Sequence, residues 1–256
     1  MRSPLTRTEW CVAVAVLGMV GVWFLLPTIQ QPPEYHDFAD HRTFLGMPNA
    51  ADVLSNVAFA LAGLYGGYCL WRGQRVLRPA VRASLLVFFV GLLLTALGSA
   101  YYHWRPVNAT LVLDRLPMTV AFAGVFGGIV AERVSLRSGI AVLAVMLLAG
   151  IASVLYWIRS DDLSAYAVVQ FGGFAGLFIL LLATRPGPEA LPWWALVAWY
   201  GISKAFELAD VMIWKASDAV VAGHLLKHVA AAVGGIVLAH ALREPPRQQL
   251  RSKPAG

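Results

Sequence analysis

The stretch "GHLLKHVAAAVGGIVLAHAL", residues 223–242, combines two features that rarely occur together. From Val229 onward it is apolar, and with the preceding residues it reaches the ~20 residues that a membrane-spanning helix needs. Its first turns carry His224, Lys227 and His228. Ionisable groups are costly inside a bilayer and usually serve a function there. The stretch therefore predicts a transmembrane helix with a polar site at its beginning.

The rest of the chain supports a membrane protein. Of its 256 residues 59% are hydrophobic and only 13% are charged, whereas soluble domains carry about 25% charged residues. Cys11 and Cys69 lie in apolar segments and form no disulfide framework. No stretch alternates with period two, as membrane strands do. We therefore expect an all-α integral membrane protein with eight apolar segments. They cover residues 10–29, 51–71, 80–103, 110–131, 138–158, 164–184, 190–213 and 222–242.

The charges between these segments predict the orientation. Basic residues concentrate on the side of the N-terminus, namely Arg72, Arg75, Arg78, Arg82, Arg133, Arg137, Arg185, Arg243, Arg247, Arg251 and Lys253. Positively charged loops remain in the cytoplasm, so both termini are expected there in a multi-pass protein. The net charge of +6 then reflects topology, and no nucleic-acid partner is expected. The first segment lacks a clear cleavage site and is interpreted as a retained helix.

Several polar residues are predicted to lie at one depth near the outer surface. Ser99 and His103 are four residues apart at the outer end of the third segment, so they share a helical face. Asp114 follows about one turn into the fourth segment, and His224 and His228 open the last one. Structural polar residues scattered at random would not be expected to agree in depth.

This set of residues has a chemical interpretation. Three histidines with an open fourth position are typical of catalytic zinc sites, and zinc lowers the pKa of a bound water toward ~7. We therefore predict His103, His224 and His228 as zinc ligands. Asp114 is the candidate for proton transfer. Ser99 is the candidate hydrogen-bond donor to a developing oxyanion.

Further polar residues occur in and beside the apolar segments. Lys204, Glu207 and Asp210 recur every three residues and are expected on one helix, where Lys204 and Glu207 can pair. A structural ion pair and a role in substrate binding both remain open for them. Lys227 points away from His224 and is expected to extend toward lipid headgroups.

The outer loop before the second segment carries oxygen ligands of the kind that calcium prefers. Asp37, Asp40 and Asn49 are the candidates, and Asp52 follows. Their spacing is not that of an EF-hand. A merely solvated loop is the alternative interpretation.

Four motifs together resemble the alkaline ceramidase family, which belongs to a superfamily with the progestin and adipoQ receptors. They are "SN" at 55–56, "GSAYYH" at 98–103, "LDRLP" at 113–117 and "GHLLKH" at 223–228. The resemblance covers residues 35–242. It implies a seven-helix transmembrane bundle in which the three histidines bind Zn²⁺ and Ser99 and Asp114 assist the water. Family members cleave the amide of ceramide into a fatty acid and a sphingoid base.

The resemblance also implies a domain organisation and a second metal. Residues 1–34 form an extra N-terminal transmembrane helix and linker, residues 35–242 the hydrolase domain, and residues 243–256 a basic cytoplasmic tail. Some relatives carry Ca²⁺ in the loop before the first family helix. Asp37 and Asp40 match that pattern loosely, whereas Asn49 stands where the family has glutamate.

Two classes of function follow from this sequence. The first is a zinc-dependent lipid amidase with its active site near the outer face, acting on ceramide or a similar N-acyl lipid with a long acyl chain. The second is a receptor-like seven-helix protein with structural zinc. The basic residues are mostly arginine, which is typical of GC-rich bacterial genomes and points to a bacterial inner membrane. Many bacteria lack ceramide. The sequence leaves the exact lipid and the oligomeric state open.

Overall fold

The computed structural model describes residues 4–187 and 190–243. Its regular structure is helical throughout this part of the chain, with one isolated bridge between Phe44 and Met47. The predicted all-α class is therefore confirmed for the described residues. Apart from Arg243, the basic tail predicted at 243–256 lies outside them.

Each apolar segment predicted from the sequence forms one helix or consecutive short helices. The helices that correspond to these segments are α1 (Arg7–Leu25), α2 (Ala50–Ser55) with α3 (Val57–Arg72), α4 (Pro79–Trp104), α5 (Asn108–Arg133), α6 (Leu136–Ser160), α7 (Ser164–Ala167) with the π-helical η2 (Val168–Gly172) and α8 (Gly173–Ala183), α9 (Trp193–Leu208) and α11 (Gly223–His240). The outer connections contain the short η1 (Pro33–His36) and α10 (Asp210–Ala216).

Six helices within the described residues are long and apolar enough to cross a membrane. They are α1, α2 with α3, α4, α5, α6, and α7 with η2 and α8. This supports a multi-pass membrane protein. The helices α9 and α11 are not among the six, because α9 has only 16 residues and the histidines and lysine of α11 lower its hydropathy. The count of seven plus one stays a prediction.

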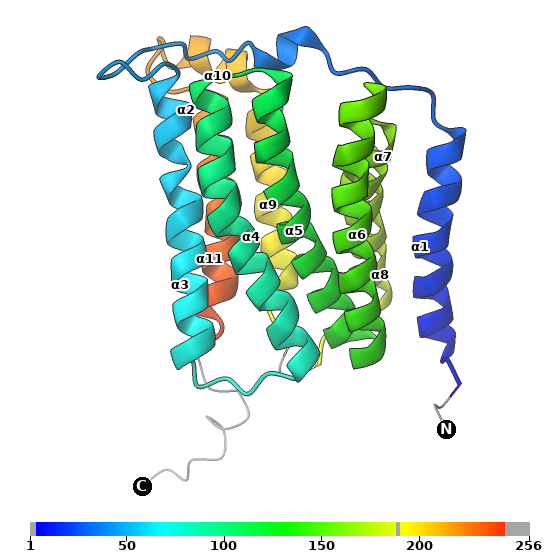
Figure 1. Ribbon diagram of the computed structural model, residues 1–256. Helices are drawn as coiled ribbons and strands as arrows, with labels where there is room; N and C mark the ends of the chain where they lie inside the picture. The colour runs from blue at the N-terminus through cyan, green and yellow to red at the C-terminus, as the bar shows by residue number, and fades with distance from the viewer. Residues whose placement is uncertain (1–3, 188–189, 244–256) are drawn as a thin grey trace, which may run out of the picture.

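The helices lie side by side, and the axes of α9 and α11 are roughly aligned with those of the apolar helices around them (Figure 1). Contacts link α9 to α11, α11 to α3, α3 to α4, α4 to α5 and α5 to α6. The beginning of α1 and the end of α11 lie at the same end of the bundle. The predicted site residues Ser99, His103, Asp114, His224 and His228 lie toward the opposite end, which we call the outer end.

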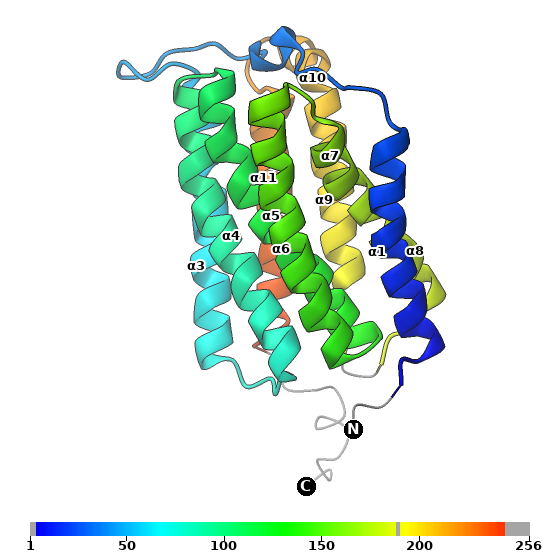
Figure 2. The same ribbon diagram turned by 45° about the vertical axis from the view of Figure 1, so that its right-hand side comes forward.

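The extra helix α1 lies at the edge of the bundle in both views (Figure 1 and Figure 2). Glu9 is its only described buried residue. The Glu9 carboxylate pairs with Arg137 at 2.5 Å near one end. Near the other end, the indole of Trp23 donates to the Ser164 hydroxyl at 3.0 Å. Polar contacts thus fasten α1 at both ends, and it stands outside the bundle that holds the site.

The contact between α4 and α5 brings two predicted site residues together. A Cβ atom at Gly98 would overlap the carbonyl oxygen of Leu113. Glycine therefore permits a backbone approach that a larger residue would prevent. The next residues on the two helices are Ser99 and Asp114, so this close packing positions their side chains beside each other.

The segment predicted at 190–213 differs from expectation at its outer end. The helix α9 ends at Leu208, and Ala209 leaves the helical conformation with φ −95° and ψ 13°. The chain then turns into α10 at the outer end of the bundle (Figure 1). Asp210 consequently does not continue the helical face of Lys204 and Glu207, and that part of the prediction is wrong.

Candidate metal centre

Three histidines from two helices converge at the outer end of the bundle. His103 comes from the last turn of α4, while His224 and His228 occupy the first turns of α11. All three side chains are buried, and each offers one ligand atom within 4.8 Å of the others. The Nε2 atoms of His103 and His224 are 3.3 Å apart. The structure therefore brings together the three predicted zinc ligands.

This geometry fits a metal ion of the size of zinc. Zinc–nitrogen bonds of 2.0–2.1 Å in a tetrahedral site place neighbouring nitrogens ~3.3 Å apart, which is the separation between His103 and His224. Within the described residues, no fourth His, Cys, Asp or Glu joins the group. The residues present thus fit a three-histidine site with one open coordination position.

The hydrogen bonds of Ser55 define the tautomer of His228. The Ser55 hydroxyl donates to the carbonyl oxygen of Asp52 at 2.8 Å. Its single proton is then committed, so its oxygen accepts from Nδ1–H of His228 at 2.7 Å. A proton on Nδ1 leaves the Nε2 lone pair of His228 free for a metal. Metal-binding histidines are commonly oriented in this way.

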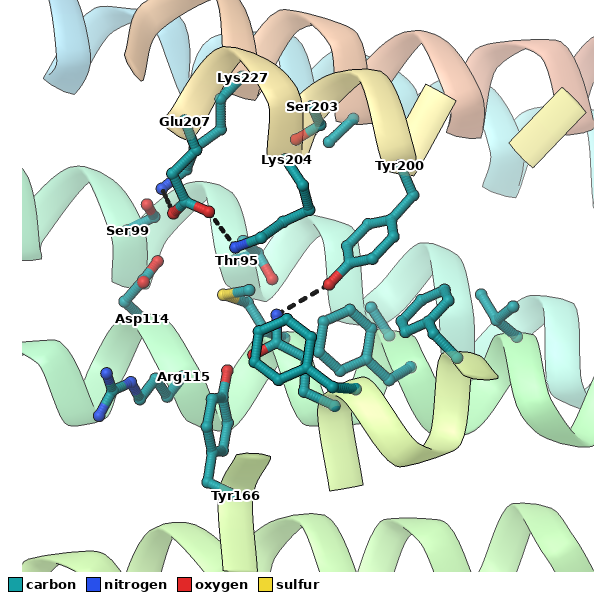
Figure 3. Close-up of a pocket in the computed structure, with 18 of the residues that line it drawn as sticks. Thr95, Ser99, Asp114, Arg115, Tyr166, Tyr200, Ser203, Lys204, Glu207 and Lys227 are labelled. Atoms are coloured by element: carbon teal, nitrogen blue, oxygen red, sulfur yellow. Dashed lines mark hydrogen bonds and ion pairs between the residues drawn. The ribbon is translucent and has the colours of Figure 1, made fainter. Parts of the chain in front are cut away.

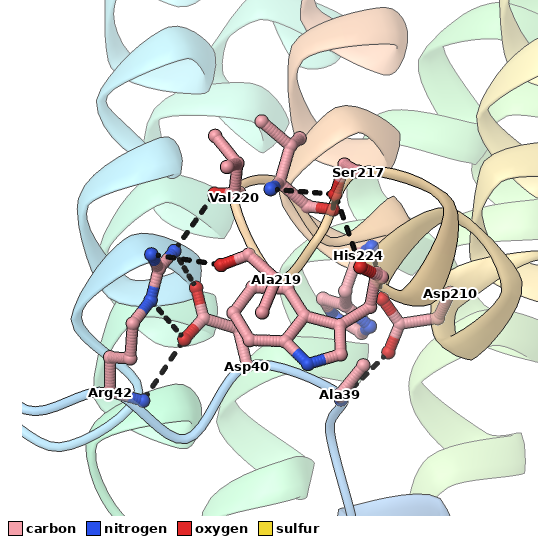
Figure 4. A network of polar contacts seen from close by, with 10 residues as sticks. Ala39, Asp40, Arg42, Asp210, Ser217, Ala219, Val220 and His224 are labelled. Carbon is pink, nitrogen blue, oxygen red and sulfur yellow. Dashed lines mark hydrogen bonds and ion pairs between the residues drawn. The ribbon is translucent and has the colours of Figure 1, made fainter.

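The backbone around the other two histidines is also fixed. Asp210 accepts from the backbone N–H of His224 at 2.8 Å and from that of Ala39 at 3.0 Å (Figure 4). The Asn49 amide donates to the carbonyl oxygen of His103 at 2.9 Å. Asp210 therefore joins the start of α11 to the outer loop, and Asn49 joins that loop to the end of α4.

The outer loop also covers the histidines with an aromatic ring. Phe38 is buried, and its ring centroid lies 4.7 Å from those of both His103 and His224. On another side of the site, Phe59 lies 5.6 Å from His228. Apolar rings around a metal site restrict the access of solvent and lower the local dielectric constant.

A cavity of about 270 Å³ adjoins the site, and His228 is part of its wall. Its lining changes from apolar to charged in the same direction on each helix. In order from the inner to the outer end, α4 contributes Phe88, Leu92, Thr95 and Ser99, and α9 contributes Leu196, Tyr200, Lys204 and Glu207. The inner part of the cavity is therefore apolar, and its charged groups lie at the depth of the histidines.

Ser99 and Asp114 lie at the charged end of this cavity, as predicted. Both side chains are buried and both line the cavity with His228. They face each other from α4 and α5 (Figure 3). The neighbouring Arg115 does not pair with Asp114, because its guanidinium donates to Gln31 at 2.6 Å. The carboxylate of Asp114 thus remains directed at the cavity.

Lys227 is not placed as expected. Its ammonium group does not reach the headgroup region but donates to the Glu207 carboxylate at 2.8 Å and lines the cavity. Lys204 pairs with the other oxygen of Glu207 (Figure 3). The predicted Lys204–Glu207 pair is confirmed, and it is part of a group of three charges. The prediction that Lys227 extends to lipid headgroups is wrong, because Glu207 on the adjacent helix offers a nearer partner.

A second, more open hollow of about 870 Å³ lies on the outer side of the site. Glu207 and Tyr35 line both this hollow and the inner cavity, and His224 lines the hollow. The metal site therefore lies between an apolar cavity that His228 reaches and an open hollow that His224 reaches.

The predicted calcium ligands are not brought together. Asp37 is exposed and pairs with His41 at 3.1 Å. Asp40 is buried and pairs with Arg42 at 2.6 Å (Figure 4). Asn49 points its amide at the backbone of His103. Each group already has a partner, so the structure lends no support to a calcium site at these residues.

Arg42 keeps the buried carboxylate of Asp40 ionised. Burial raises the pKa of Asp40, but hydrogen bonds from Arg42 and its positive charge outweigh burial and hold that pKa below its ordinary value. The guanidinium also donates to the carbonyls of Ala219 and Val220 at 3.2 and 3.0 Å. The pair thus fastens the outer loop to the turn before α11.

Sequence reasoning missed several supporting residues. The resemblance includes Ser55 without a contact to His228, the spacing places Asp210 on the face of Lys204, and no contact of Phe38 with the histidines is predicted. The "SN" motif was the available signal for Ser55. Nothing in the spacing indicates that Asp210 binds the backbone of His224, because the break at Ala209 redirects it.

Comparison with known proteins does not extend this description. No family model matches the chain, and no curated protein matches it significantly. The function is therefore argued from the site alone.

Proposed function

We propose that the protein is a zinc-dependent intramembrane amidase that hydrolyses an N-acyl lipid to a fatty acid and an amine. One observation carries this proposal. The three buried histidines with matched ligand atoms stand at the charged end of an otherwise apolar cavity that also contains Asp114 and Ser99. The site thus offers a metal position, a proton acceptor and a hydroxyl donor beside space for an acyl chain.

The substrate amide would lie at the depth of the histidines, with its acyl chain extending inward along Leu92 and Phe122. The oxygen of a water molecule forms a bond to the carbonyl carbon, and Asp114 accepts the proton of that water. The hydroxyl of Ser99 donates to the amide oxygen as negative charge develops on it. Asp114 then delivers its proton to the nitrogen while the C–N bond breaks.

His103, His224 and His228 would hold the metal ion. A zinc ion bound there supplies Lewis-acid chemistry, which activates water at neutral pH and polarises the carbonyl group. The Ser55–His228 hydrogen bond keeps one ligand in the required tautomer. Phe38 and Phe59 limit the bulk water around the ligands.

The receptor-like alternative is less well supported. Structural zinc sites are usually closed by four protein ligands, whereas the described residues provide three. The adjoining cavity and the buried Asp114 have no evident purpose around a purely structural ion. Both features favour an enzyme.

The decisive test is hydrolysis by the purified full-length protein. Zinc-loaded protein is incubated with N-acyl lipids in detergent micelles, and the released fatty acid is quantified by mass spectrometry. We expect release that a chelator abolishes and that added zinc restores. Protein with about one zinc per chain and no amidase activity on any N-acyl lipid would refute the proposal.

We also propose that the site faces the outside, with both termini in the cytoplasm. A cysteine is introduced for Leu45, which lies at the exposed outer loop, after Cys11 and Cys69 have been replaced. A membrane-impermeant maleimide should label it in intact cells. Labelling only after lysis would invert the orientation and place the site on the inner face.

A further inference from the structure

The charged end of the cavity contains more cations than carboxylates. Among the described residues of its lining, Lys204, Lys227 and Arg115 are cationic, while Glu207 and Asp114 are acidic. Glu207 serves both lysines, one through each oxygen. A single carboxylate thus neutralises one of two ammonium groups.

Arg115 does not find a carboxylate elsewhere. Its side chain is 5% exposed, and Nη2 donates to the neutral amide of Gln31 at 2.6 Å. The guanidinium lies over the rings of Trp157 and Tyr166, at 4.3 and 5.1 Å from their centroids. Its Nη1 has no hydrogen-bond partner among the described residues. Arg115 therefore adds a positive charge near the cavity that no described carboxylate pairs with.

An uncompensated positive charge is expensive in a site of low dielectric constant. The three neutral histidines add no negative charge, and a divalent metal would increase the excess. A ligand with one negative charge would compensate the lysine that Glu207 leaves without a counter-charge. The cations lie at the outer end of the cavity, opposite the apolar part that suits the acyl chain.

We propose, building on the amidase function above, that the substrate carries one carboxylate on the amine side of its amide. The substrate class is then an N-acyl amino acid lipid rather than a neutral ceramide. Lys204 and Lys227, which share Glu207, bind the carboxylate, while the acyl chain extends inward. Hydrolysis releases a fatty acid and an amino acid.

Two lipids with the same chain test this inference. N-palmitoylglycine carries a carboxylate where N-palmitoylethanolamine carries a hydroxymethyl group. The kcat/KM for palmitate release is measured for both with zinc-loaded full-length protein in neutral detergent. We expect roughly tenfold or greater preference for N-palmitoylglycine, since a desolvated ion pair discriminates by such factors. Equal rates, or preference for the ethanolamide, would overturn the inference.

A lysine variant identifies the source of the preference. Lys204→Gln should reduce the ratio of the two kcat/KM values about tenfold, whereas Lys204→Arg should retain most of it. Arg105→Gln is the matched control, because Arg105 is exposed on the outer turn and away from the cavity. An equal reduction by Arg105→Gln would mean that general surface charge attracts the acidic lipid, which also overturns the inference.

Failure of the amidase proposal can be distinguished from failure of this one. If neither lipid is hydrolysed, both persist, and their effect on the melting temperature of the protein is compared. Greater stabilisation by N-palmitoylglycine, lost in Lys204→Gln, would support the acidic binding site and refute the hydrolase. Equal stabilisation by the two lipids would overturn the acidic site itself.

Discussion

The histidine centre and the outer loop were both predicted from the sequence to bind a metal, and they differ in what their polar atoms contact. In the centre, the Nε2 atoms of His103 and His224 meet each other at 3.3 Å. In the loop, the Asp40 carboxylate is held by Arg42 and the Asn49 amide by a backbone carbonyl. The centre leaves ligand atoms free, whereas the loop uses its polar atoms to hold itself in place.

The difference shows that residue type alone does not make a metal site. A ligand atom must be free of other partners and must converge with others within a few ångströms. The loop instead supports the centre indirectly, because its backbone N–H at Ala39 shares Asp210 with the backbone of His224. The two regions therefore should respond differently to mutation, which the following experiments can test.

The largest difference is expected for the metal ligands. His224→Ala should reduce bound zinc from about one ion per chain to nearly none and abolish turnover, because two histidines rarely retain zinc. The matched control is His240→Ala, at the other end of α11, where the ring bonds Tyr65 at 3.0 Å. Elemental analysis of purified protein measures both. Equal zinc content in wild type and His224→Ala would contradict the metal site.

The next largest effect concerns proton transfer. Asp114→Asn keeps the shape of the side chain but removes the base, so zinc should remain while turnover falls by roughly 10²–10⁴-fold. Ser99→Ala should cause a smaller loss, of about 10²-fold or less. The readout is fatty-acid release with zinc content determined in parallel. Near-normal turnover of Asp114→Asn would make Glu207 the next candidate base.

In the outer loop we expect an effect on stability rather than on metal content. Asp40→Asn should lower the free energy of unfolding by about 1–3 kcal/mol, because it leaves Arg42 without its charged partner. Asp37→Asn should change it by less than about 0.5 kcal/mol, since Asp37 is exposed. Denaturation in detergent compares the two variants. Equal losses would show that burial of Asp40 contributes nothing.

The ion pair between Asp40 and Arg42 also predicts that stability depends on pH. The pKa of Asp40 in the folded protein lies below the ordinary value of 3.8, so its stabilisation is complete above that value. It is lost as the pH falls through the lower folded pKa. The wild type should therefore lose its advantage over Asp40→Asn only below about pH 4. A constant difference in melting temperature down to pH 3 would contradict this assignment.

The smallest effect is expected for calcium. Because Asp37, Asp40 and Asn49 already have other partners, adding calcium or a calcium-selective chelator should leave the melting temperature unchanged. Magnesium serves as the control for general ionic effects. A calcium-specific increase that Asp40→Asn removes would show that the loop rearranges to bind the ion, and it would remove the contrast with the histidine centre.

The sequence by itself determined the helical class, the approximate position of every apolar segment and the depth of the site. These features follow from local rules. Bilayer thickness sets the length of an apolar run, and the helical repeat places Ser99 with His103 and His224 with His228 on common faces. The three candidate ligands were predictable for this reason, since they lie at the ends of their segments.

Only the tertiary structure decided which polar groups meet and which are already occupied. Lys227 reaches Glu207, because α9 and α11 pack together. Asp210 leaves its expected face, because the chain bends at Ala209. Contacts between helices join residues that are distant in the sequence, 20 positions apart for Glu207 and Lys227 and 121 for His103 and His224, and no local pattern predicts them. The free atoms of the histidines and the satisfied atoms of the loop are consequences of that packing.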